Sequence, residues 1–124
     1  MKVDGAMKNI CILLRRPPYG SVDAAEAVRH ALGGAIEDDV QVTLILVDSG
    51  VNVARKGQDV SGSAYDNLGD GISDCLNMGV RVIADCASLE EAGLGSNDIH
   101  FGIEVAHGPE IGSIIKNANA TMIF

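Results

Sequence analysis

Cys86 is the residue whose surroundings in the sequence most favour a chemical role. It follows the apolar run 82–84 and precedes Ser88 and Glu91, which have the spacing of a capping box. This spacing predicts a short helix from Ser88 to Gly93. A thiol just before a helix N-terminus lies near the positive end of the helix dipole, which favours the thiolate. The thiolate attacks sulfur donors and can carry a persulfide, so Cys86 is a candidate nucleophile.

The neighbours of Cys86 also support a second interpretation. Asp85, Glu90 and Glu91 lie close in the sequence, and their charges would raise the pKa of the thiol. If the thiol is functional, we expect the helix end to outweigh these acids. The alternative is that Cys86 is a small hydrophobic residue at a strand–helix junction, because free cysteines are often buried.

The other two cysteines have the pattern of core residues. Cys11 lies inside an unbroken apolar run, and Cys75 falls on the apolar stripe of a predicted helix. A resolving partner for Cys86 is the alternative role for Cys75. Three cysteines without a CxxC pair are typical of free thiols in a reducing compartment, which predicts a cytoplasmic protein.

Two adjacent arginines, Arg15 and Arg16, follow the first apolar run, in a loop that two prolines stiffen. Guanidinium groups beside a helix N-terminus can hold an anion. Arg15, Arg16 and Ser88 are therefore candidates for binding an anion or for supporting a thiolate at Cys86. The alternative is a solvated loop whose arginines pair with surface acids or with a neighbouring subunit.

Several classes of function are disfavoured. The sequence has neither a dinucleotide fingerprint nor a GxxxxGK motif, no nucleophile elbow, and no close Cys or His pair for zinc, so we expect no cofactor and no metal. The net charge is −8 and aromatic residues make up 3% of the chain, which argues against direct binding of nucleic acid. No uncharged stretch approaches the ~20 residues of a membrane helix. The segment 1–7 lacks the apolar block of a secretory signal.

These residues must be positioned by alternating strands and helices. The chain of 124 residues is expected to form one domain, 1–124. Short apolar runs alternate with amphipathic periods, which predicts an α/β fold of three layers with a parallel sheet. The predicted strands are 9–14, 40–47, 80–84 and 120–124, with a weaker one at 100–105; the predicted helices cover 24–35, 65–76 and 111–118, and a short helix followed by a mobile loop is expected over 48–63.

Ligands of such sheets gather at the carboxyl ends of the strands. The loops 15–21, 48–50 and 85–88 follow predicted strands and are therefore the expected site region.

Four segments together resemble the DsrE/DsrF-like sulfur-relay family, particularly its DsrF/TusC branch. They are residues 8–21, residues 51–58 with Lys56-Gly57-Gln58, the run 86–94 from Cys-Ala-Ser-Leu to Gly-Leu, and the closing 120–124. The resemblance spans nearly the whole chain, and 86–94 is its most specific part. It implies a five-stranded parallel sheet between helices, an α/β/α sandwich, in trimers or hexamers, often with sister subunits.

The resemblance also implies a function. In this family a cysteine in the loop after this strand can accept sulfur as a persulfide, and that role maps onto Cys86. The protein would then be a sulfurtransferase or persulfide carrier acting between sulfur donor and acceptor proteins. In heteromeric relays the essential cysteine belongs to the DsrE/TusD-type subunit, so a non-catalytic structural subunit is one alternative. A small-molecule- or anion-binding α/β domain is the other. Apolar area at Tyr19, Met78 and 51–53 agrees with an oligomer of closed symmetry.

Overall fold

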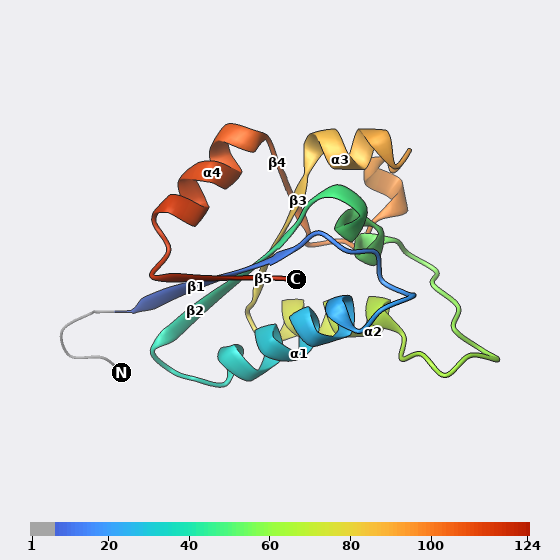
Figure 1. Ribbon diagram of the computed structural model, residues 1–124, viewed down its shortest axis with the longest axis horizontal. Helices are drawn as coiled ribbons and strands as arrows, with labels where there is room; N and C mark the ends of the chain where they lie inside the picture. The colour runs from blue at the N-terminus through green and yellow to red at the C-terminus, as the bar shows by residue number, and fades with distance from the viewer. Residues whose placement is uncertain (1–6) are drawn as a thin grey trace.

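A five-stranded sheet with helices on both faces forms the body of the computed structural model, which describes residues 7–124 (Figure 1). The predicted α/β sandwich is confirmed. The expectation about a secretory signal concerns residues that lie, apart from Met7, outside the described part. Along the chain the elements are β1 Lys8–Leu14, α1 Asp23–Ala35, β2 Val40–Leu46, the 3₁₀ segment η1 Asp48–Ala54, α2 Leu68–Asn77, β3 Arg81–Asp85, α3 Cys86–Glu91, η2 Ser96–Asp98, β4 Glu104–Ala106, α4 Gly108–Lys116 and β5 Ala120–Ile123.

All four strand pairs are parallel, and the strand order is β4-β3-β2-β1-β5. The chain thus moves outward from β1 through β2 and β3 to β4, and then returns to the other side of β1 for β5. Because all strands point the same way, the segments that follow β1, β2 and β3 meet at one edge of the sheet, as predicted.

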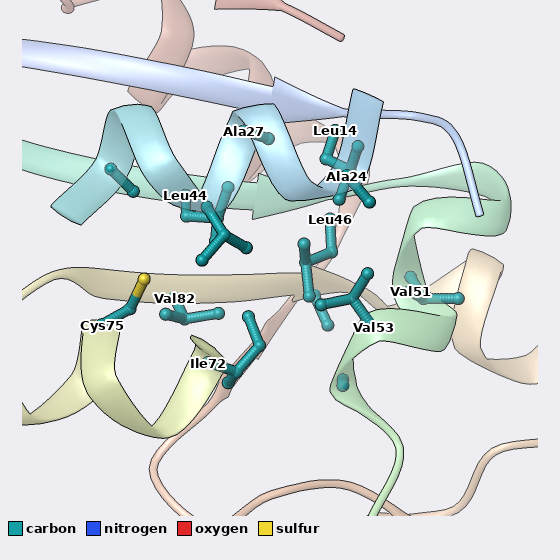
Figure 2. Packing of buried hydrophobic residues seen from close by; sticks show 14 of the residues in the cluster. Leu14, Ala24, Ala27, Leu44, Leu46, Val51, Val53, Ile72, Cys75 and Val82 are labelled. Atoms are coloured by element: carbon teal, nitrogen blue, oxygen red, sulfur yellow. The ribbon is translucent and has the colours of Figure 1, made fainter. Parts of the chain in front are cut away.

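The main core lies between the sheet and the helices α1 and α2 (Figure 2). Small residues such as Ala24 and Ala27 on α1 face the aliphatic side chains of β1 and β2, including Leu14, Leu44 and Leu46. A smaller apolar cluster lies under α4 on the opposite face, and it contains Cys11, Ile45, Ile83, Ala106 and Ile111. The central strands are therefore covered on both faces at their carboxyl halves, which explains their continuous apolar sequence.

The weakest predicted strand is displaced. Residues 101–102 form a turn in which Gly102 has φ of +100° and Phe101 is almost fully exposed, and the strand is Glu104–Ala106. The second predicted helix begins at Leu68 rather than at Tyr65, because the Asn67 side chain accepts a hydrogen bond from the Asp70 amide and caps it there. Among residues 7–124, no helix has the length and apolar character needed to span a membrane.

Candidate functional site

Cys86 lies at the carboxyl end of β3, in the first turn of α3. Asp85 is the N-cap of this helix, and its carboxylate accepts a hydrogen bond from the Ser88 amide at 3.2 Å. The predicted helix start at Ser88 is therefore wrong by two residues. The carboxylate at the end of the strand reaches the Ser88 amide, so the helix begins at Cys86.

Ser88 joins α3 to the segment after β2. Its hydroxyl donates to the Asp85 carboxylate at 2.6 Å and accepts from the Asp48 amide at 2.9 Å. The side chain is buried, with 8% exposure. Asp48 itself has φ of +50°, a left-handed conformation that costs energy in a non-glycine residue. The Ser88 hydroxyl therefore holds the turn at Asp48 against α3.

Acidic groups surround the Cys86 thiol. Its Sγ lies 3.7 Å from Oε1 of Glu90, and the side chain is partly exposed. Partial desolvation raises the pKa of Cys86, and the charge and hydrogen bond of Glu90 and the charge of Asp85 raise it further. The expectation that the helix end outweighs the acids is wrong. The helix has only six residues, and the acids Asp85 at its N-cap and Glu90 one turn after Cys86 favour the protonated thiol.

The other two thiols are core residues, as predicted. Cys11 and Cys75 are buried, and burial raises the pKa of both, that of Cys75 to about 11 with a further contribution from Asp74. Cys75 cannot serve as a resolving partner. Its carbonyl accepts from the Val80 amide at the start of β3, whereas Cys86 follows the end of that strand. Five residues of strand span roughly 16 Å, well beyond the reach of a disulfide.

The structure does not bring Arg15 and Arg16 to Cys86. Both arginines follow β1, and β2 lies between β1 and β3 in the sheet. Arg16 forms an exposed ion pair with Asp23 at 3.8 Å. The charges that shift the pKa of Cys86 are those of Glu90 and Asp85. The predicted set of Arg15, Arg16 and Ser88 is thus divided between the loop after β1 and the helix α3.

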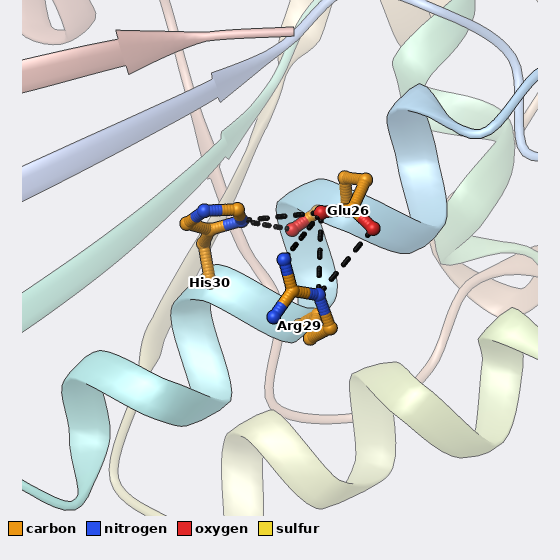
Figure 3. Close-up of polar contacts among 3 residues, drawn as sticks. All are labelled: Glu26, Arg29 and His30. Atoms are coloured by element: carbon orange, nitrogen blue, oxygen red, sulfur yellow. Dashed lines mark hydrogen bonds and ion pairs between the residues drawn. The ribbon is translucent and has the colours of Figure 1, made fainter.

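Other arginines are also held by acids on the surface. On the exposed face of α1, Arg29 Nη2 lies 2.6 Å from Glu26 Oε2, and His30 Nδ1 lies 2.8 Å from the Glu26 carbonyl oxygen (Figure 3). The hydrogen bond from Arg29 lowers the pKa of Glu26. On the sheet, Arg81 donates to Glu104.

A cavity of about 260 Å³ lies next to α3, between it and η1. Its lining includes the acids Asp48 and Glu91 and the neutral polar residues Ser49, Asn52 and Ser88. The sequence predicted that residues 48–50 and 85–88 belong to the site, but it did not predict Asn52. Asn52 lines the cavity because it lies in η1, and the position of η1 is not evident from the sequence. The acidic lining disfavours an anion as the occupant of this cavity.

The fold agrees with what the comparison with known families shows. The model of the DsrE/DsrF-like family matches residues 8–124. The chain belongs to this family. In this DsrE/DsrF-like protein, Cys86 is the partly exposed cysteine at the carboxyl edge of the sheet.

Two relatives and one solved structure are informative. The intracellular sulfur oxidation protein DsrF of Allochromatium vinosum is 33% identical over 101 residues, which cover 81% of this chain and 71% of that protein. An uncharacterized protein of Methanopyrus kandleri is 26% identical over 115 residues, 93% of each chain. The crystal structure of the ychN protein from E. coli superimposes with a TM-score of 0.86 at 22% identity, covering 95% of this chain and all of that one, and supports the fold alone.

Proposed function

We propose that this protein is an intracellular sulfur-relay protein that accepts sulfane sulfur on Cys86 and passes it on as a persulfide. Family membership and the similarity to a sulfur oxidation protein support the relay role. The observation that carries the assignment to Cys86 is its exposure. Cys11 and Cys75 are buried in the two cores, and Cys86 lies partly exposed where α/β proteins bind their ligands.

The transfer itself is a thiol exchange at sulfur. The Cys86 thiolate attacks the outer sulfur of a donor persulfide, the donor S–S bond breaks, and the donor leaves as a thiolate. The proton that Cys86 loses goes to solvent or to a base at the interface. An acceptor thiolate then attacks the outer sulfur of the Cys86 persulfide, and Cys86 leaves as a thiolate. The two steps involve no net oxidation.

Mass spectrometry of the intact chain and of its peptides tests the proposal. After incubation with glutathione persulfide, we expect the peptide that contains Cys86 to gain the mass of one sulfur atom, and the gain to disappear on reduction. Loading on Cys11 or Cys75 in the folded protein, with Cys86 unmodified, would contradict it.

Glu90 should slow this chemistry in the isolated protein. Replacing Glu90 with Gln removes a charge 3.7 Å from Sγ, so the pKa of Cys86 falls and more thiolate is present at pH 7. Because nucleophilicity falls with the pKa, we expect the alkylation rate with iodoacetamide to rise by only about threefold.

The matched control for this prediction is the adjacent glutamate. Glu91 lines the cavity and is not among the groups that raise the pKa of Cys86, so Glu91→Gln should leave the rate unchanged. Equal rates in the wild type and in Glu90→Gln across the pH range would show that Glu90 does not control the thiol.

A second candidate function is a structural subunit of a hetero-oligomeric relay complex. The raised pKa of Cys86 favours it, because both charged neighbours of the thiol are acids and no basic residue among residues 7–124 is paired with them. In that case a sister chain would carry the sulfur, and this chain would supply contact surface.

For both candidates we expect an assembly of subunits. Val51 and Val53, expected to offer apolar surface, are buried in the main core instead. Exposed apolar side chains occur on both edge strands, with Val105 of β4 at 50% and Ile123 of β5 at 64% exposure, and also outside the sheet, as at Phe101 and Met78. Exposed apolar edge strands are typical of surfaces that pair with another chain. We expect light scattering at micromolar concentration to show a closed oligomer, such as a trimer or hexamer, and a monomer would contradict this.

A further inference from the structure

A second cavity, of about 430 Å³, lies on the α4 side of the sheet, away from Cys86. Cys11, Thr43 and Arg81 form part of its lining and are adjacent in register on β1, β2 and β3. Central strands of a parallel sheet are normally apolar on both faces. Here the face is polar at the amino halves of the strands, beyond the apolar cluster under α4. The volume is that of a small-molecule site.

Two polar groups in this cavity lack good partners within the protein. Thr43 is 7% exposed, and its hydroxyl, which no described residue pairs with, is open to the cavity. The Ile114 carbonyl, in the last turn of α4, has the Cys11 thiol as its partner within the described residues, at a long 3.9 Å. A carbonyl at a helix end is a group that structures normally satisfy, and an open hydroxyl offers a ligand a hydrogen bond. Thr43 can donate or accept, and the Ile114 carbonyl requires a donor.

The charges in the cavity lining limit which charged groups a ligand can carry. Arg81 is the charged residue in the lining, and its Nε and Nη2 donate to Glu104 at 2.8 and 2.9 Å, which leaves Nη1 free. Because Glu104 already offsets the charge of Arg81, an anion with two or more charges is disfavoured, whereas a single carboxylate can still accept a hydrogen bond from Nη1. The opposite end of the cavity is formed by the C-terminal end of α4. The negative end of the helix dipole lies there and favours a cation. One end of the cavity therefore suits a carboxylate and the other end an ammonium group.

Spacing sets the length of the ligand. Cys11, next to the Ile114 carbonyl, and Arg81 are two strands apart, about 10 Å between Cα atoms. Two extended residues span about 7 Å, which fits this distance once the Arg81 side chain is included. We propose that this cavity binds a zwitterion of dipeptide size, with its carboxylate at Arg81 and Thr43 and its ammonium at the Ile114 carbonyl.

Isothermal titration calorimetry of the full chain with alanylalanine tests this proposal. We expect saturable binding, and we expect weaker binding of free alanine, which is too short. N-acetyl-alanylalanine, which lacks the ammonium, and alanylalanine amide, which lacks the carboxylate, should each bind at least about tenfold more weakly. Equal binding of the blocked and free peptides, or no binding at millimolar concentration, would overturn the proposal.

Conservative variants locate the site. Thr43→Val keeps the side-chain shape and should weaken binding about tenfold, as should the paired Arg81→Gln and Glu104→Gln change, which leaves no unpaired charge. Thr121→Val, on the same sheet row but outside the cavity lining, is the matched control and should bind like the wild type. Unchanged binding in Thr43→Val would exclude this cavity. Dissociation of an oligomer by Thr43→Arg, together with no peptide binding in the wild type, would assign the face to a second copy instead.

Discussion

Replacing Cys86 with Ser is expected to abolish persulfide loading of the protein. Serine keeps the size of the side chain but removes the sulfur nucleophile, and a hydroxyl does not exchange with a persulfide. Because Cys86 is partly exposed and makes one long contact, to Glu90, we expect the free energy of unfolding to change by less than about 0.5 kcal/mol. Loss of loading without loss of stability is thus the expected signature, measured by mass spectrometry beside a thermal melt.

The other two cysteines provide the matched controls. Cys11→Ser and Cys75→Ser should load normally on Cys86, and each should lower the free energy of unfolding by about 1–3 kcal/mol, because each places a hydroxyl in an apolar core. Their loading and melts are measured side by side with Cys86→Ser. Should Cys86→Ser retain full relay activity together with its sister subunits, the persulfide role is wrong and the structural-subunit role replaces it.

The sequence was sufficient to predict the elements whose periodicity is strong. β1 and β2 are continuous apolar runs and α1 carries an apolar stripe, so their positions agree with prediction to within one or two residues. The prediction of a strand at 100–105 missed the true position of β4. A three-residue edge strand is too short to show a period, and Phe101, which is exposed in a turn, is of a residue type common in strands.

The candidate site could be predicted in position but not in electrostatics. That Cys86 follows β3 is visible in the sequence, since an apolar run ends just before it. Which groups approach the thiol depends on where α3 begins. A start at Cys86 instead of Ser88 places Glu90 one helical turn after the thiol, on the same face. The separation of Arg15 and Arg16 from Cys86 follows from strand order, which local patterns do not contain.

Gly50 is where a single methyl group should disturb the fold most, and with it the support of Cys86. A Cβ at this position would lie 2.2 Å from the Leu14 carbonyl oxygen. That carbonyl cannot move aside without losing its hydrogen bond from the Val47 amide at 3.0 Å. We therefore expect Gly50→Ala to lower the free energy of unfolding by about 3 kcal/mol, roughly 10 °C in the thermal midpoint. Gly33, exposed in α1, has open space around its Cβ position, so Gly33→Ala should instead raise stability by about 1 kcal/mol.

Because η1 holds Asp48 against Ser88, displacement of η1 in Gly50→Ala should also make alkylation of Cys86 faster at temperatures below the melt. Equal melting temperatures for Gly50→Ala and Gly33→Ala would show that η1 does not pack on the end of β1 in this way.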